Sequence, residues 1–417
     1  MDTSRIILYV FVILKFVQYI FERYLSFKNR QYYLNPQRQV EAQKILGISD
    51  EDMQRSLAYS TDKYYFGYTA SRFKLFLFLV FLIGGGLGWV EMFAQYLSGA
   101  KNAISTGMYF FGVLMLLSTI VSLPFDYYSV FVIEEKHGFN RQTKKTFFVD
   151  RLKAITIGLV LGGLLLALVL WIMQNLTNWW IYAATAVCIF SLLTAWLYPT
   201  FLAPLFNKFS PLPEGELKDK IYKLADQIGF NCAGLSIMDA STRSSHGNAY
   251  FTGVFGKKKI VLFDTLVESL TPDQVVAVLA HELGHFKLNH VRNTLIRSFA
   301  MTFAIFFLLS LCLPLKEFYT AFRLDAASNY GALIVFSLWF SSIDFIMQPF
   351  ENYLSRKNEF AADDFAKKHA GGYADLAAAL LKLREKSHSM PISHPLFSAV
   401  YYSHPPMIER LKAMQQS

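Results

Sequence analysis

Long apolar runs dominate the pattern of this chain. Seven of them reach about 20 residues, the length that crosses the hydrocarbon core of a bilayer as a helix. We therefore predict an integral membrane protein with seven transmembrane helices. The predicted spans cover about residues 6–25, 75–97, 108–133, 153–174, 179–203, 295–315 and 329–350.

The basic residues of the polar segments predict an orientation. They gather after the first run, for example Lys28 and Arg30, and after the third, for example Lys136 and Arg141. The short segment after the fourth run has none. Because basic segments normally stay cytoplasmic, we expect the N-terminus outside. Two polar regions, 207–293 and 351–417, then lie together on the cytoplasmic face.

Three charged residues fall inside or beside the predicted spans: Asp126, Arg297 and Asp344. Charged side chains at such depth usually face a partner helix or a water-filled cavity. The sequence leaves both interpretations open.

Composition supports the membrane assignment. Hydrophobic residues make up 53% of the 417 residues, and charged residues 17%, against about 25% in soluble proteins. The net charge of +9 does not indicate nucleic-acid binding, because the basic residues lie between the apolar runs, where they set orientation. The three cysteines are widely spaced and predict neither a disulfide framework nor a cysteine-based zinc site.

Residues 213–293 have the pattern of a small α/β unit. Residues 214–228 show helical spacing. Three short runs read as strands, at 234–238, 249–254 and 260–263, with a turn at 256–259 between the last two. A further helix begins at Thr271-Pro272, with Gln274 placed for a capping box.

That helix carries the strongest chemical signal, His281-Glu282-x-x-His285. The two histidines lie one helical turn apart on one face and can bind one zinc ion, while Glu282 can act as general base toward a water. A surface helix with two histidines is the competing interpretation, and the well-formed helix start argues against it.

A catalytic zinc site needs a third protein ligand from elsewhere in the chain. The best candidates are Glu359 and Asp363, which share a face of a helix predicted to end at Gly371-Gly372. Glu359 could bind the metal and Asp363 could orient a histidine ligand. On pattern alone, an acidic pair on a helix is more often a solvated surface than a ligand set.

The sequence also resembles the type I CAAX prenyl protease family of membrane zinc metallopeptidases over nearly its whole length. The resemblance rests on the zinc motif and on five further segments in order: Ile133–Asn140, Ala203–Phe209, Arg243–Phe251, Glu359–Asp363 and Ser403–Pro406. It implies a mainly α-helical fold in which seven transmembrane helices form an α-barrel around a large cavity, capped by a zincin-like α/β protease domain.

The resemblance also implies roles for individual residues. His281, His285 and Glu359 would bind one zinc ion per chain, and Glu282 would be the base. Asn248, Ala249 and Tyr250 would form an edge strand that binds an extended peptide, and His404 would stabilise the oxyanion. Other histidines, including His290, which we place on a different face from His285, are expected to have no metal role.

The implied domains are a membrane region (1–206), the zinc protease domain (207–293), the last two spans (294–350) and a C-terminal part carrying the third ligand (351–417). We expect a monomeric zinc metalloendopeptidase that cleaves peptides, including prenylated ones, at the bilayer. The compact length and the C-terminus without a retrieval signal suggest a bacterial homologue in the inner membrane, or the endoplasmic reticulum in a eukaryote.

Two other functions compete with this interpretation. A heat-shock-type quality-control protease shares the zinc motif but has about four spans. A transporter with a non-catalytic zinc site would not need Glu282.

Overall fold

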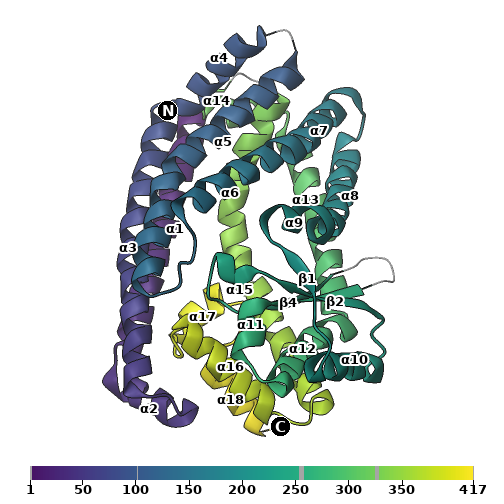
Figure 1. The fold of residues 1–417 in the computed structure, drawn as a ribbon. Helices are drawn as coiled ribbons and strands as arrows, with labels where there is room; N and C mark the ends of the chain where they lie inside the picture. Colours follow the sequence, from purple (N-terminus) through teal and green to yellow (C-terminus); the bar gives the residue numbers. More distant parts are fainter. Residues whose placement is uncertain (1, 101, 253–257, 325–327, 417) are drawn as a thin grey trace.

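The computed structural model describes residues 2–100, 102–252, 258–324 and 328–416, and most of them are helical (Figure 1). In this part of the chain, seven helical segments are long and apolar enough to cross a membrane, as predicted. They are α1 (Thr3–Tyr33), α3 (Asp50–Ile83), α5 (Ala103–Tyr128), α6 with α7 (Lys144–Ile157, Gly163–Asn175), α8 with α9 (Trp179–Leu197, Ala203–Phe206), α13 (His290–Cys312) and α15 (Asn329–His369). π-Helical turns at Ser129–Glu134, Gly158–Gly162 and Tyr198–Leu202 extend or join these segments.

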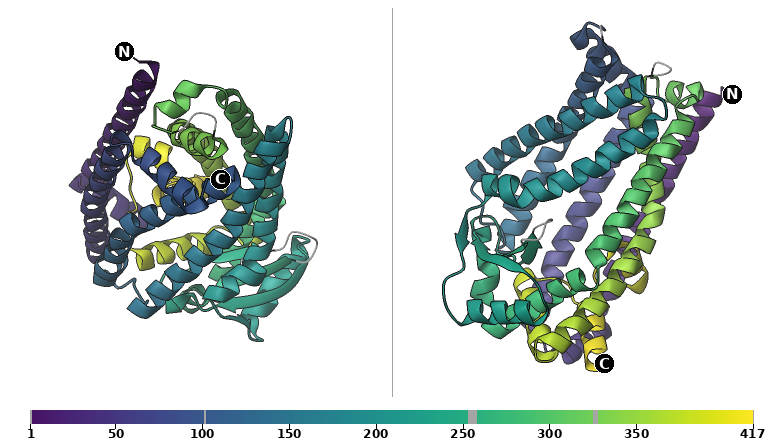
Figure 2. Two further views of the ribbon diagram at one scale, coloured as in Figure 1. Left: turned by 90° about the horizontal axis from the view of Figure 1, so that it is seen from above. Right: turned by 90° about the vertical axis from the view of Figure 1, so that its right-hand side faces the viewer.

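The long helices stand in a ring when viewed from above (Figure 2). Only 6% of the most apolar stretch of α1, of α5 and of α13 is buried against protein, and 33% of that of α15. Side chains of a close-packed bundle would be far more buried, so the low values fit helices that contact their neighbours around a hollow. Large apolar side chains such as Phe76 and Trp89 are exposed, as expected for a protein that lies in lipid.

The bounds of one predicted span are wrong. The predicted span at 75–97 is broken by Gly84 and Gly85, which separate α3 from α4 (Gly86–Ser98). Gly85 has a φ of 79°, and a Cβ there would lie 2.7 Å from the Arg323 side chain, so the turn requires glycine. An average of hydropathy over about 20 residues does not detect a turn of two glycines, so the prediction joined the end of α3 to α4. The last predicted span lies within a longer helix, because α15 continues through Pro349 to His369.

Two of the three charged residues near the spans have ion-pair partners on a neighbouring helix. Asp126 lies 2.9 Å from Arg151, and Arg297 lies 3.8 Å from Glu351. Pairing between helices is therefore the correct interpretation for these two. Asp344 is exposed on α15.

The cap lies at the end of the molecule that holds the C-terminus (Figure 1). Its four-stranded sheet has the order β1-β2-β4-β3, with β2 and β4 parallel and the outer pairs antiparallel. The strands are β1 (Phe209–Pro211), β2 (Cys232–Met238), β3 (Ala249–Thr252) and β4 (Lys258–Phe263). The predicted strands match β2, β3 and β4. Residues 253–257, which include the end of one predicted strand and the first half of the predicted turn, lie outside the described residues. The second half of that turn is wrong, because Lys258 and Lys259 belong to β4.

Helices from distant parts of the chain cover this sheet. The cap helices are α2 (Pro36–Leu46), α10 (Glu216–Gln227), α11 (Asp264–Ser269), α12 (Pro272–Lys287), α16 (Ala374–Ser387), α17 (Pro395–Tyr401) and α18 (Met407–Gln416), with a 3₁₀ turn at Ala240–Thr242 and the short α14 (Lys316–Thr320) at the opposite end. One core joins Leu262 of β4, Leu279 of α12, Ala366 of α15 and Ala379 of α16. The regions before and after the last two spans thus pack as one unit.

Candidate metal centre and active site

The helix that carries His281 and His285 starts as the sequence predicts. Thr271 caps α12, and its side chain and that of Gln274 form the reciprocal bonds of a capping box. Pro272 occupies the first helical turn. Both histidines project from one face, and their Nε2 atoms lie 3.2 Å apart. Two imidazole nitrogens that converge in this way can bind the same metal ion.

Glu359 of α15 reaches the same point from the other side. Its Oε1 lies 3.2 Å from His285 Nε2, and its Oε2 lies 3.5 Å from His281 Nε2. Helices α12 and α15 approach closely because residue 284 is glycine: a Cβ there would lie 3.2 Å from the Cβ of Phe365. The third ligand predicted from the sequence is therefore in reach of both histidines.

The donor set fits a metal ion. One ligand atom from each of His281, His285 and Glu359 lies within 4.8 Å of the others. The Glu359 side chain is buried, and its Oε2 has no hydrogen bond of good geometry among the described residues, although His404 Nδ1 lies 2.8 Å away. A buried carboxylate is costly unless positive charge, such as that of a metal ion, compensates it. Two nitrogens and one carboxylate are a common ligand set for a catalytic zinc ion.

A second layer of residues holds His281 in place. Asp363 Oδ1 lies 2.8 Å from His281 Nδ1, as predicted for a residue that orients the imidazole. Arg410 of α18 donates to both oxygens of Asp363, at 2.9 and 2.5 Å. Burial disfavours a charged His281, but Asp363 and Glu359 outweigh it and raise the pKa of His281 to about 9. The carboxylates thus give the site a negative electrostatic potential, which favours binding of a cation.

Sequence reasoning missed Arg410. It lies in a polar terminal helix, 47 residues from Asp363, and nothing in the local pattern shows that its side chain is buried. A single arginine on the apolar side of that helix was the available signal.

The predicted face of His290 is wrong, although His290 does not belong to the group of three ligand residues. His290 Nδ1 lies 3.0 Å from His285 Nδ1. Helix α12 ends at Lys287, and Asn289 adopts a left-handed conformation with a φ of 58° before α13 begins. This turn reverses the face on which a continuous helix would place His290. The side chain can therefore fix the His285 ring from behind.

Glu282 faces the pocket in front of this cluster. The pocket, with a volume of about 120 Å³, is lined by Glu282, Glu359, Asn248, Ala249 and His404, among others. Burial raises the pKa of Glu282, although His281 and His285 oppose that shift. A carboxylate whose pKa lies above the usual range is a better proton acceptor for water.

The predicted peptide-binding segment lies on the free edge of the sheet. Strand β3 is hydrogen-bonded only to β4 within the described sheet. Asn248 and Ala249 line the pocket, whereas the ring of Tyr250 packs on the other face, 6.3 Å from that of Phe263. The structure thus brings the Asn248 and Ala249 side chains to the site and turns the Tyr250 ring away.

His404 lies at the mouth of the pocket, in the segment between α17 and α18. Its Nδ1 is 2.8 Å from Glu359 Oε2, and 66% of its side chain is exposed. The exposed ring can contact both the cluster and an incoming ligand.

The other histidines have local partners. His137 lies 2.7 Å from Asp62, His246 stacks on Phe139, and His394 caps α17. In these three cases the ordinary structural interpretation agrees with the observed contacts.

Comparisons with known proteins support this picture over the whole chain. Residues 30–208 match the family described as "CAAX prenyl protease N-terminal, five membrane helices", and residues 211–417 match "Peptidase family M48". The chain is 38% identical to CAAX prenyl protease 1 homolog of Arabidopsis thaliana over 95% of both proteins. It is 36% identical to CAAX prenyl protease 1 of Saccharomyces cerevisiae, over 95% of this chain and 92% of that protein.

A solved structure shares the fold. The crystal structure of S. mikatae Ste24p matches with a TM-score of 0.89 and 36% identity, covering 99% of both chains. The prediction of a bacterial homologue is not borne out, since these relatives are eukaryotic. The predicted membrane metalloendopeptidase is confirmed, and a heat-shock-type protease or a transporter is not. The chain belongs to the CAAX prenyl protease group of peptidase family M48, membrane-embedded metalloendopeptidases.

Proposed function

We propose that this protein is a zinc endopeptidase that cleaves near the C-terminus of prenylated peptides. The observation that carries the proposal is the convergence of His281, His285 and Glu359 in front of a free strand edge. The printed names of the relatives, CAAX prenyl proteases, support the substrate class.

His281, His285 and Glu359 would hold one zinc ion, with Asp363 orienting His281. When bound, zinc would polarise the scissile carbonyl and make a water more acidic. All three ligands come from one chain, which supports a monomer as the active unit.

Glu282 is the proposed proton acceptor. It would take a proton from the attacking water and pass it to the leaving amine. His404, at the mouth of the same pocket, would donate a hydrogen bond to the carbonyl oxygen as negative charge develops on it. The Asn248 side chain could contact the same oxygen.

The edge strand would set the register of the substrate. Phe263 N–H donates to Asn248 C=O, so residues 248 and 250 use their backbone groups toward β4. In an antiparallel ladder the backbone groups of Ala249 and Phe251 then face the free edge. An extended peptide could bind to them without much reading of its side chains.

The proposed orientation follows the basic segments, with the N-terminus outside and the cap on the cytoplasmic face. The domains would be the membrane region 1–206, two cap segments, 207–293 and 351–417, and the spans between them. Because the named relatives are eukaryotic, the endoplasmic reticulum is the proposed membrane.

The test uses the purified full chain in detergent, loaded with zinc, and a farnesylated peptide with a C-terminal CAAX sequence. Mass spectrometry should detect the released C-terminal fragment. The Glu282→Gln variant should retain zinc and lose at least about a thousandfold in kcat, because general-base catalysis and correct water activation are both removed. Cleavage by the variant at the wild-type rate would contradict the proposal.

A further inference from the structure

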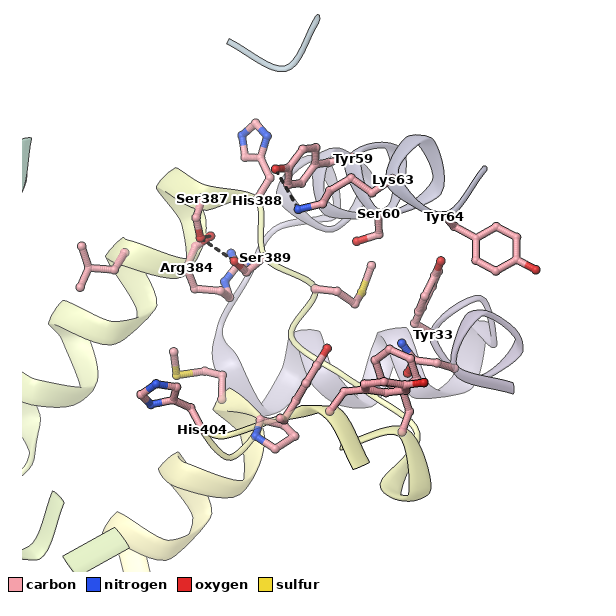
Figure 3. Close-up of a pocket in the computed structure, with 18 of the residues that line it drawn as sticks. Tyr33, Tyr59, Ser60, Lys63, Tyr64, Arg384, Ser387, His388, Ser389 and His404 are labelled. Carbon is pink, nitrogen blue, oxygen red and sulfur yellow. Dashed lines mark hydrogen bonds between the residues drawn. The ribbon is translucent and has the colours of Figure 1, made fainter. Parts of the chain in front are cut away.

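A second, larger cavity opens next to the proposed active site. Its volume is about 840 Å³, and its walls come from α1, α3, α16 and the segment that leads to α18 (Figure 3). Lys63 and Tyr59 of α3 lie on one side of it and His404 on another (Figure 3). The cavity therefore lies between the membrane helices and the cap.

The charged side chains that line this cavity are all basic. Arg23, Lys63, Arg384 and Lys386 line it, and none of the described residues in its walls is an aspartate or a glutamate. Arg384 is neutralised, since it forms a buried ion pair with Asp52. Among the described residues, Arg23, Lys63 and Lys386 form no ion pair, and the Nε of Arg23 is buried without a hydrogen-bond partner.

Uncompensated cations that face one space attract an anion into it. Tyrosine hydroxyls line the same walls, including those of Tyr33 and Tyr64, and can donate further hydrogen bonds. A carboxylate, with two acceptor oxygens, suits this mixture of ammonium and hydroxyl donors.

The cavity connects directly with the catalytic pocket. Gly247 and His404 line both spaces. Gly247 and His246, which also lines the large cavity, immediately precede Asn248 and strand β3. The segment from His246 to Ala249 therefore runs from the large cavity into the catalytic pocket.

Strand direction decides which end of a substrate enters the large cavity. Antiparallel pairs outnumber parallel ones two- to three-fold, and β3 already pairs antiparallel to β4. A peptide that binds antiparallel to β3 runs with its C-terminal side toward Gly247 and His246. Three extended residues span about 10 Å, so a chain end a few residues beyond the scissile bond reaches into the cavity.

We propose that this cavity is a binding site for the free C-terminal carboxylate of the substrate, with Lys63 and Lys386 as its cationic donors. The inference rests on the proposed function and adds to it the group that selects a chain end over an internal segment. Such a site places the scissile bond at a fixed number of residues from the C-terminus, because the carboxylate and the metal centre are both fixed points.

The experiment compares two farnesylated peptides of identical sequence, one with a free C-terminal acid and one with a C-terminal amide. We expect wild-type kcat/KM to be about tenfold higher for the acid, a typical value for one charge-assisted contact. In Lys63→Gln/Lys386→Gln the ratio should fall to less than about threefold, because two of the three unpaired cations are removed. The control Lys44→Gln/Lys382→Gln removes the same charge from exposed lysines outside the cavity and should keep the wild-type ratio.

A binding measurement keeps this test separate from catalysis. Fluorescence anisotropy with zinc-loaded Glu282→Gln gives the Kd of both peptides without turnover, and the acid should bind about tenfold more tightly. If the wild type does not cleave the farnesylated peptides, but the variant still binds the acid more tightly than the amide, the proposed function is wrong and the carboxylate site stands. Equal Kd values for acid and amide would overturn the site.

An anionic lipid headgroup has similar chemistry and is distinguished by a second arm. Micelles with and without phosphatidylglycerol should give the same kcat/KM for each peptide, and therefore the same acid-to-amide ratio. If phosphatidylglycerol instead changes both rates alike, and the double lysine substitution abolishes that change, the cavity binds a lipid and the proposal is wrong.

Discussion

The guanidinium of Arg410 donates to both carboxylate oxygens of Asp363, and one of these oxygens also lies 2.8 Å from His281 Nδ1. The last helix of the chain thus reaches the metal centre through one carboxylate. Asp363 and His281 come from α15 and α12, so three helices that are distant in sequence meet at this contact.

Replacing Arg410 should therefore weaken both the fold and the metal site. Arg410→Met leaves the buried Asp363 with only the His281 contact, and breaking a buried ion pair costs about 3–5 kcal/mol of unfolding free energy. Loss of a residue behind a metal ligand lowers affinity about 10–100-fold. Thermal unfolding and zinc titration would measure the two effects. Lys412→Met, at a half-exposed position on the same helix, is the matched control and should change neither.

His290 should act through His285. Because its Nδ1 contacts the nitrogen of His285 that faces away from Glu359, His290→Phe should free the His285 ring and lower zinc affinity about tenfold. His290→Asn keeps a polar atom near the same position and should restore most of the affinity. Equal zinc affinity in His290→Phe and the wild type would show that the contact has no role in the site.

His404 should affect the rate more than metal binding. Removing one hydrogen-bond donor to an oxyanion typically lowers kcat about 10²–10³-fold. His404→Ala should show a loss of this size, with bound zinc unchanged and KM altered by less than about threefold, because the contact is strongest in the transition state. Steady-state kinetics and metal analysis together test this prediction. A loss of zinc in the variant would instead make His404 part of the metal site.

The parts of the structure that depend on local sequence could be predicted. The start of α12 follows from Thr271, Pro272 and Gln274, and the convergence of His281 and His285 follows from helical spacing alone. Hydropathy found the number of spans because each contains a long apolar run, although it misplaced the bounds of the second. Glu359 could be proposed because it shares a face with Asp363 on a helix with clear end signals.

The remaining features depend on how distant segments pack. Arg410 resembles a surface arginine until α18 is seen against α15. The role of His290 depends on one left-handed residue, Asn289, between two helices. The break at Gly84 and Gly85 is invisible to an average over apolar residues, and the cationic cavity arises only when α1, α3 and the C-terminal segment come together.

The most direct test of the central claim measures the zinc content of Glu359→Ala by mass spectrometry, with Asp364→Ala as the control. Asp364 is exposed on the same helix, whereas Glu359 is buried between the two histidines. We predict about one zinc ion per chain in the wild type and in Asp364→Ala, and less than about a tenth of that in Glu359→Ala after dialysis against a chelator. A wild-type zinc content in Glu359→Ala, with the fold intact, would contradict a metal centre held jointly by α12 and α15.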